Sequence, residues 1–187
     1  LPCEPNVPDG IDSAAGVSFD SNYMLCIKVT MDPDDYTRMA RETRFLADYK
    51  SIDEVFEEFS KIQSNIPQSW PSEYNWYQAD IEVDGVSLDK VGIRRKGFIG
   101  SLYSPVPSFK IKTDKFVKDQ FLGDTERITL NSIPWDYTRM FTCLTYEIFA
   151  AAGHPAPRCN LANLTVNGQP FGPYVHVEAI KKRSLRR

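Results

Sequence analysis

Residues 75–97 read NWYQADIEVDGVSLDKVGIRRKG, and their alternation of apolar and polar side chains decides the expected fold. Alternation with a period of two runs on both sides of Asp84-Gly85, which is typical of strands whose successive side chains point to opposite faces. An Asp-Gly pair between two such runs favours a type I′ turn, because both central residues of that turn need positive φ. The stretch therefore predicts an antiparallel β-hairpin.

Further strands are predicted on both sides of this hairpin. Strand-like patterns occupy residues 23–30, 107–116 and 127–132. Residues 158–178 predict a second hairpin, which turns on Asn167-Gly168. Strands therefore dominate the chain after its first 20 residues.

Three helices are predicted between the strands. One begins after Asp32 within residues 31–50, and a capping box of Ser51 and Glu54 begins a second that runs to about residue 63. The third spans 137–152, with Asp136 as its N-cap and Gly153 as its stop. We therefore expect an α+β fold, an antiparallel sheet with a long packed helix. Residues 1–20 are expected to form an extended, loosely attached arm, and residues 21–187 a single domain.

Composition excludes several classes of protein. A chain of 187 residues with 42% apolar content suits one globular domain. Its net charge of -3 argues against a nucleic-acid-binding protein, which is usually basic. Apolar runs long enough for a transmembrane segment are absent from the sequence, and the chain begins without a charged and then apolar leader.

The four cysteines and two histidines show no metal-ligand spacing. Cysteines at widely separated positions without a C-x-x-C pair argue against a structural zinc site. They leave free thiols, one disulfide or two disulfides, and spacing does not choose between these. His176 alternates with apolar neighbours and is interpreted as a core or lining histidine. The positions of the cysteines are Cys3, Cys26, Cys143 and Cys159.

Cations gather on two of the predicted strands. Within a strand, Arg94 and Lys96 share one face and Arg95 points to the other. Lys110 and Lys112 likewise share a face. If the two strands pair with these faces aligned, up to four cations crowd one patch, and an anion would relieve their repulsion. The alternative for each residue is an ordinary solvated or ion-paired side chain.

Five ordered blocks of this sequence resemble the CotH kinase family, named for a spore-coat protein kinase. The resemblance runs from about residue 23 to the end of the chain. The blocks are VGIRRKGFIGS (91–101), SFKIKTDKF (108–116), RITLNSIPWDYTRMF (127–141), YEIFAAAGHPAPRCN (146–160) and VNGQPFGPYVHVEAIKKR (166–183).

This resemblance implies an atypical protein kinase that uses ATP and Mg²⁺ or Mn²⁺ to phosphorylate Ser or Thr in coat or cell-surface proteins. It implies that residues 21–187 are the N-terminal, nucleotide-binding lobe. By this resemblance we expect the chain to stop short of a second lobe that carries the metal ligands, and we therefore expect no metal ligand here and an inactive fragment. An extracellular or cell-surface location is implied, with ATP and a protein substrate as partners and no nucleic acid.

The resemblance also implies roles for particular residues. Lys110 resembles the strand lysine that holds the α- and β-phosphates of ATP, and Glu147 resembles the helix glutamate that orients such a lysine. Each residue also has a simpler interpretation. Lys110 is then an ordinary exposed strand lysine, and Glu147 an ordinary residue at the boundary of a helix face. Glu178 resembles a residue beside the adenine. The remaining candidates for cofactor binding, all in the loop over the phosphates, are Arg94, Arg95, Lys96, Gly97 and Ser101.

The family resemblance is also compatible with two other hypotheses of function. In the first, the chain is a catalytically inactive surface-binding module of the same fold. In the second, it is a structural coat or adhesin component. Partner binding that survives removal of Lys110 would favour the first of these.

Overall fold

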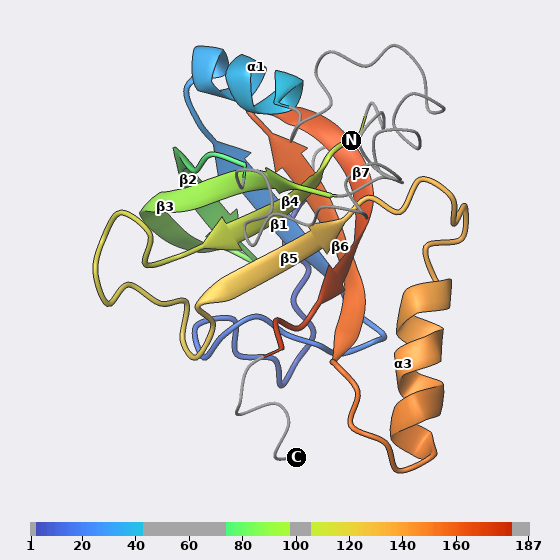
Figure 1. Ribbon diagram of the computed structural model, residues 1–187. Coiled ribbons are helices and arrows are strands. Elements are labelled where there is room, and N and C mark those ends of the chain that lie inside the picture. Colours follow the sequence, from blue (N-terminus) through green and yellow to red (C-terminus); the bar gives the residue numbers. More distant parts are fainter. Residues whose placement is uncertain (1–2, 43–73, 98–105, 181–187) are drawn as a thin grey trace, which may run out of the picture.

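The computed structural model describes residues 3–42, 74–97 and 106–180 (Figure 1). The predicted helix at 51–63 lies outside these ranges, as does Ser101. The elements in chain order are β1 (Met24–Thr30), α1 (Pro33–Arg41), β2 (Tyr77–Val83), β3 (Val86–Lys96), β4 (Ser108–Lys112), β5 (Arg127–Asn131), α3 (Phe141–Ala151), β6 (Cys159–Val166) and β7 (Gln169–Val177).

The seven described strands form a closed barrel in the order β1-β2-β3-β4-β5-β7-β6 (Figure 1). Neighbouring strands are antiparallel except β1 and β6, which pair in parallel from Met24 opposite Leu161 to Val29 opposite Val166. Side chains that alternate inward fill the barrel, as expected for a small closed sheet. The largest of these fully buried apolar residues are Leu25, Ile27, Ile93, Phe109, Ile111, Ile128, Leu130, Leu164 and Tyr174.

The expected α+β fold, an antiparallel sheet with a long packed helix in the manner of a kinase lobe, is wrong. The sheet closes on itself because β1 pairs in parallel with β6, a strand more than 130 residues away in sequence. Alternation along one strand cannot reveal such a distant partner, since it reports only which side chains point inward. The described helices are two short ones, of 9 and 11 residues.

The third predicted helix is also shorter and less buried than expected. It begins at Phe141 instead of residue 137, and none of its eleven described residues has a buried side chain. Arg139 adopts a φ of 61°, which is incompatible with the right-handed helix predicted there. Asp136 still accepts hydrogen bonds from the backbone N–H groups of Thr138 and Phe141, both at 3.0 Å. It therefore closes a turn before the helix instead of starting it.

Both predicted hairpin turns are confirmed. Asp84 and Gly85 have φ values of 51° and 87°, and Asn167 and Gly168 have values of 48° and 77°. Asp84 also holds the start of β1, since its Oδ1 accepts hydrogen bonds from the Tyr23 hydroxyl (2.7 Å) and the Cys26 backbone N–H (2.8 Å). The helix start at α1 is confirmed as well, because the Asp32 side chain accepts from the N–H groups of residues 34 and 35.

Two disulfides tie non-barrel segments to the barrel. Cys3 pairs with Cys26 of β1, and Cys143 of α3 pairs with Cys159 of β6. The first fastens residues 3–20, which also donate a hydrogen bond from the Val17 N–H to the Thr125 hydroxyl at 3.0 Å. The N-terminal arm is thus held against the barrel. Among the described residues, no helix is both long enough and apolar enough to cross a membrane.

Candidate functional site

Strands β3 and β4 pair in the register that brings the predicted cations together. Arg94 lies opposite Lys110, Lys96 opposite Ser108, and Gly92 opposite Lys112. Because Ile93, Phe109 and Ile111 alternate with these cations and are buried in the barrel, the cations point outward. We call this set of four side chains the basic face: Arg94, Lys96, Lys110 and Lys112.

The residues of the basic face have different environments. The guanidinium carbon of Arg94 lies 4.5 Å from the centroid of the Trp76 ring, a cation–π contact. The Lys112 ammonium lies 3.3 Å from a carboxylate oxygen of Asp114, so part of its charge is balanced within the chain. The Lys115 ammonium lies 5.6 Å from the Trp76 centroid and extends the positive charge beyond the four residues.

Lys96 is a half-buried cation at one end of the basic face. Its ammonium donates a hydrogen bond to the side-chain oxygen of Asn131 on β5. Burial lowers the pKa of Lys96, and the nearby charge of Lys110 lowers it further. A lysine in this position gains most from an anion, because a negative ligand offsets both the desolvation and the repulsion.

Arg95 is turned away from the basic face. It is 6% exposed, and its Nη1 donates to the carbonyl oxygens of Ala40 (2.6 Å) and Glu42 (3.2 Å) at the end of α1. It therefore satisfies carbonyls that the helix end leaves without partners. Gly97, directly after β3, has a φ of 143°, a conformation that favours glycine where the chain leaves the strand.

Glu147 lies exposed in the middle of α3. Within the described residues no ion pair joins it to Lys110, so the structure does not bring these two predicted catalytic residues together. α3 contacts β6 and β7.

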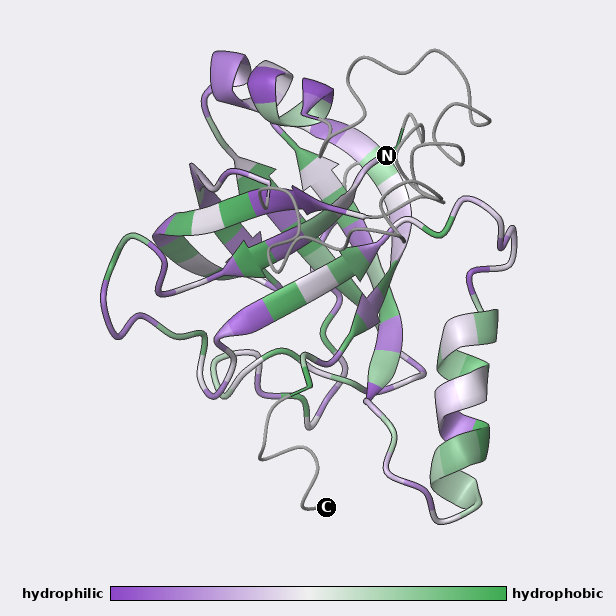
Figure 2. Ribbon diagram, in the orientation of Figure 1, coloured by the Kyte–Doolittle hydropathy of each residue, from purple (hydrophilic) through white to green (hydrophobic). Residues whose placement is uncertain are grey.

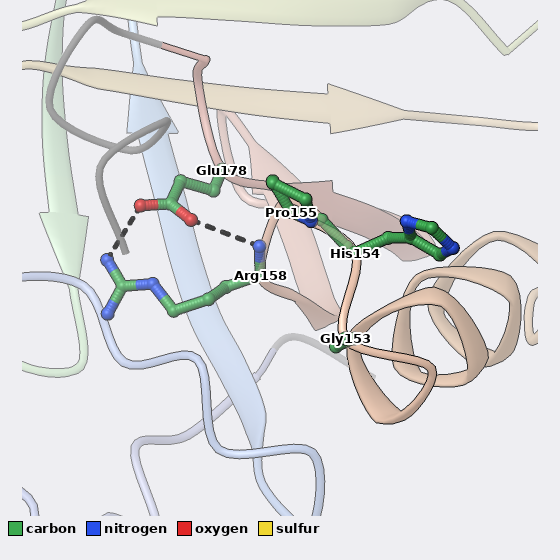
Figure 3. A pocket seen from close by; sticks show the side chains of 7 residues that line it. Gly153, His154, Pro155, Arg158 and Glu178 are labelled. Carbon is green, nitrogen blue, oxygen red and sulfur yellow. Dashed lines mark hydrogen bonds and ion pairs between the residues drawn. The ribbon is translucent and has the colours of Figure 1, made fainter.

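Glu178 lines a pocket of about 380 Å³ between the end of α3, the start of β6 and the end of β7 (Figure 3). Its two carboxylate oxygens accept hydrogen bonds from the Arg158 backbone N–H (3.0 Å) and the Arg158 guanidinium (3.1 Å). The volume lies within the usual range for small-molecule sites. The other residues lining the pocket are Ala150, Gly153, His154, Pro155 and Ala156.

His176 is confirmed as a core histidine. It is fully buried, its Nδ1 lies 2.8 Å from Asn160 Oδ1, and its ring stacks on Phe19 at 4.5 Å between centroids. Burial lowers the pKa of His176 to about 3, with a smaller lowering from the charge of Arg158, so the ring is neutral at physiological pH. Arg158 also stacks on Phe19 from the pocket side, at 4.4 Å.

Trp76, Asn131 and Arg158 belong to these sites but did not stand out in the sequence. Asn131 and Arg158 lie within blocks that resemble the family, but neither those blocks nor a local pattern gives any of the three residues a role. Their contacts depend on strands that are distant in sequence, so these residues could be assigned to a site only after the strand pairing was known. Among the described residues, no group of three or more His, Cys, Asp or Glu side chains is placed to hold a metal ion.

Comparison with known proteins identifies one family. A model of the CotH kinase protein family matches residues 93–187, just over half of the chain. The matched range starts inside β3 and contains every residue predicted above to act in catalysis or cofactor binding. A comparison with curated proteins finds no match.

Proposed function

The chain belongs to the CotH kinase protein family, and we propose that it supplies the ATP-binding part of an atypical kinase that phosphorylates Ser or Thr in coat or cell-surface proteins. One observation carries the proposal. The register of β3 and β4 sets Arg94 directly opposite Lys110 and places Lys96 beside them, all on the outer side of the barrel.

Such an arrangement suits a polyphosphate. Like charges opposite one another across a sheet repel, which costs about 0.2–1 kcal/mol for an exposed pair. A triphosphate would convert this repulsion into attraction, because its oxygens accept charge-assisted hydrogen bonds from several cations at once. Lys110, which lies on β4 between the levels of Lys112 and Lys96, is the residue we assign to the α- and β-phosphates. ATP supplies the phosphoryl group that is transferred.

The remaining assignments follow from the same proposal. The pocket beside Glu178 is assigned to the adenine, since it offers apolar walls and a polar edge of suitable size. The reaction is expected to need Mg²⁺ or Mn²⁺, with ligands outside the described residues. The two disulfides, which use all four cysteines, support an extracellular or cell-surface location because such pairs persist in oxidising compartments.

An ATP titration by calorimetry tests the proposal, with and without MgCl₂. The variants are Lys110→Met and, as a matched control, Lys118→Met, whose side chain is exposed and lies off the basic face. We expect Lys110→Met to weaken ATP binding by tenfold or more and Lys118→Met to change it less than twofold. ATP binding that Lys110→Met leaves unchanged would contradict the assignment of Lys110, and absence of ATP binding would contradict the proposed function itself.

A second function, a binding or structural module without kinase activity, is favoured by a different observation. The helix α3 exposes large apolar side chains that the barrel does not cover. A module of this kind would still bind its partner after Lys110→Met and would not phosphorylate it. A kinase would instead phosphorylate a coat protein, as measured by mass spectrometry, and would lose this activity in Lys110→Met.

A further inference from the structure

Helix α3 turns its most apolar side away from the barrel. Phe141, Leu144, Ile148 and Ala151 recur at intervals of three and four residues and so form one stripe along the helix. All four are exposed, whereas the partly buried residues of the helix are Thr142, Cys143 and Tyr146. Figure 1 shows α3 standing beside the barrel, and Figure 2 shows hydrophobic residues along it. The side of the helix that faces away from the barrel is therefore apolar.

The residues before α3 extend this apolar surface. Trp135 is 82% exposed and Tyr137 97% exposed, and both precede the helix by a few residues. We call the whole set the α3 surface: Trp135, Tyr137, Met140, Phe141, Leu144 and Ile148. With about 200 Å² for each large apolar side chain, the exposed fractions amount to roughly 800 Å².

That area exceeds what a monomer ordinarily exposes. The largest apolar patch of a monomeric protein covers about 300–600 Å². A standard protein interface buries about 800 Å² on each partner, with aromatic residues and methionine enriched and charges depleted at its centre. The α3 surface matches both the area and the composition, since Glu147 is the single charged residue of α3.

We propose that two copies of this chain associate through the α3 surface. The spacing of Phe141, Leu144, Ile148 and Ala151 is the one by which two helices interlock their apolar stripes. A two-fold interface uses the same patch on both subunits, so the patch must complement itself. An uncharged apolar stripe can complement itself, because no like charges repel one another when two copies of it meet. The proposal does not depend on ATP binding, since the α3 surface and the basic face involve different elements.

A disulfide holds the helix in place for this contact. Cys143 lies on the barrel side of α3 and is bonded to Cys159 of β6. The covalent link anchors a helix that has no buried side chain, and it leaves the apolar stripe facing outward. The α3 surface is thus presented in a fixed orientation before any partner binds.

Sedimentation velocity of the 187-residue chain at about 1–100 µM, the range of ordinary protein dimers, tests the proposal. We expect a monomer–dimer equilibrium that Leu144→Glu weakens at least tenfold. Phe116→Glu, an exposed aromatic residue outside the α3 surface, serves as the matched control and should leave the equilibrium unchanged. Ile148→Gln provides a second, milder variant, and circular dichroism checks that each variant folds.

Hydrogen exchange tests whether a second copy of the chain is what covers the α3 surface. Protection of the α3 amides that rises with protein concentration would support association of two copies. A chain that stays monomeric at the highest concentration would overturn the proposal, as would a dimer that Leu144→Glu and Ile148→Gln leave intact. Protection of α3 that stays the same over the whole concentration range would also overturn it, because association of two copies must shield the helix beyond what its own hydrogen bonds and the disulfide provide.

Discussion

Arg94 of β3 lies directly opposite Lys110 of β4, so two positive side chains face outward from neighbouring positions of the barrel. The pairing is imposed by the core, because Ile93 and Ile111 on the same strands are buried and also pair with each other. A shift of one residue would turn the cations inward and these apolar residues outward. Burial of the apolar side chains therefore maintains the repulsion between the two cations.

Trp76 should report an anion that binds this pair. Its ring lies 4.5 Å from the guanidinium carbon of Arg94, so a phosphate on Arg94 would change the electric field at the indole. We expect ATP to change the tryptophan fluorescence with the same midpoint as the calorimetric titration. Trp76→Phe should abolish the change and Trp135→Phe should retain it. A signal that persists in Trp76→Phe would place the anion elsewhere.

Arg94→Gln should weaken ATP binding about tenfold, or roughly 1.4 kcal/mol. Glutamine keeps hydrogen-bond donors at this position but removes the charge that pairs with a phosphate. The affinity is measured by calorimetry, and Arg127→Gln serves as the control. Arg127 lies on β5, two residues before Thr129, which is the partner of Lys110. Equal losses in the two variants would mean that the cations act only through general charge.

ATP binding should be coupled to proton uptake by Lys96. Burial and the charge of Lys110 lower the pKa of this lysine, and phosphate oxygens beside it would raise the pKa again. The complex therefore takes up a proton at alkaline pH, where the free protein has lost part of this charge. Calorimetry in two buffers of different ionisation enthalpy measures the uptake, which we expect to grow as pH rises and to vanish in Lys96→Met. Uptake that is unchanged in that variant would assign the proton to another group.

His176 should make the folded protein less stable in acid. Its pKa is about 3 in the folded protein and near the usual 6.5 when unfolded, so between these values the unfolded state binds more protons. Stability therefore falls as pH decreases below about 6.5, by up to about 1.4 kcal/mol per pH unit from this group.

Urea unfolding at several pH values measures this effect. His176→Gln, which keeps a hydrogen-bonding partner for Asn160 but does not titrate, should remove the contribution of the histidine. His154→Gln is the matched control, because His154 is exposed and is the other histidine of the chain. Parallel pH profiles for the wild type and His176→Gln would show that the buried ring is not responsible.

Loss of the Cys143–Cys159 disulfide should release α3 while the barrel stays folded. The bond closes a segment of 16 residues, for which the loss of unfolded-state entropy is worth about 3 kcal/mol. An isolated helix of 11 residues is marginal in water, and α3 has no buried side chain to hold it. In a Cys143→Ser, Cys159→Ser variant we expect fast hydrogen exchange over residues 141–151 and slow exchange in β1, β3 and β4. The paired variant Cys3→Ser, Cys26→Ser should leave α3 protected, and equal protection of α3 in both variants would contradict the prediction.

Local features of the chain were predictable because they depend on a few adjacent residues. The two hairpin turns follow from the tolerance of Asp84, Asn167 and the next glycine for positive φ, and α1 begins where Asp32 caps it. The grouping of Arg94 with Lys96, and of Lys110 with Lys112, follows from the period of a strand. The family was identified from ordered motifs, and the comparison with known families agrees with it.

Features that depend on distant contacts were not predictable from these patterns. The alternation of the strand could place Arg95 on the face opposite to Arg94 but not against the carbonyl of Ala40. Helical periodicity could place Glu147 on α3 but could not show that this position is exposed. α3 starts late because Asp136 closes a turn before it, where its side chain accepts from the Phe141 N–H. An aspartate before a helical pattern is compatible with either a helix cap or such a turn.

Short segments of the chain were enough to predict the turns, the strands, the separation of cations from apolar residues and the family. The folded chain was needed to show that β1 pairs with β6 to close a barrel, that the cations of β3 and β4 meet in register, and that α3 faces outward. Turn conformation and side-chain alternation are set by neighbouring residues. Strand partners and helix burial are instead set by the free energy of packing the whole core, which no single segment contains.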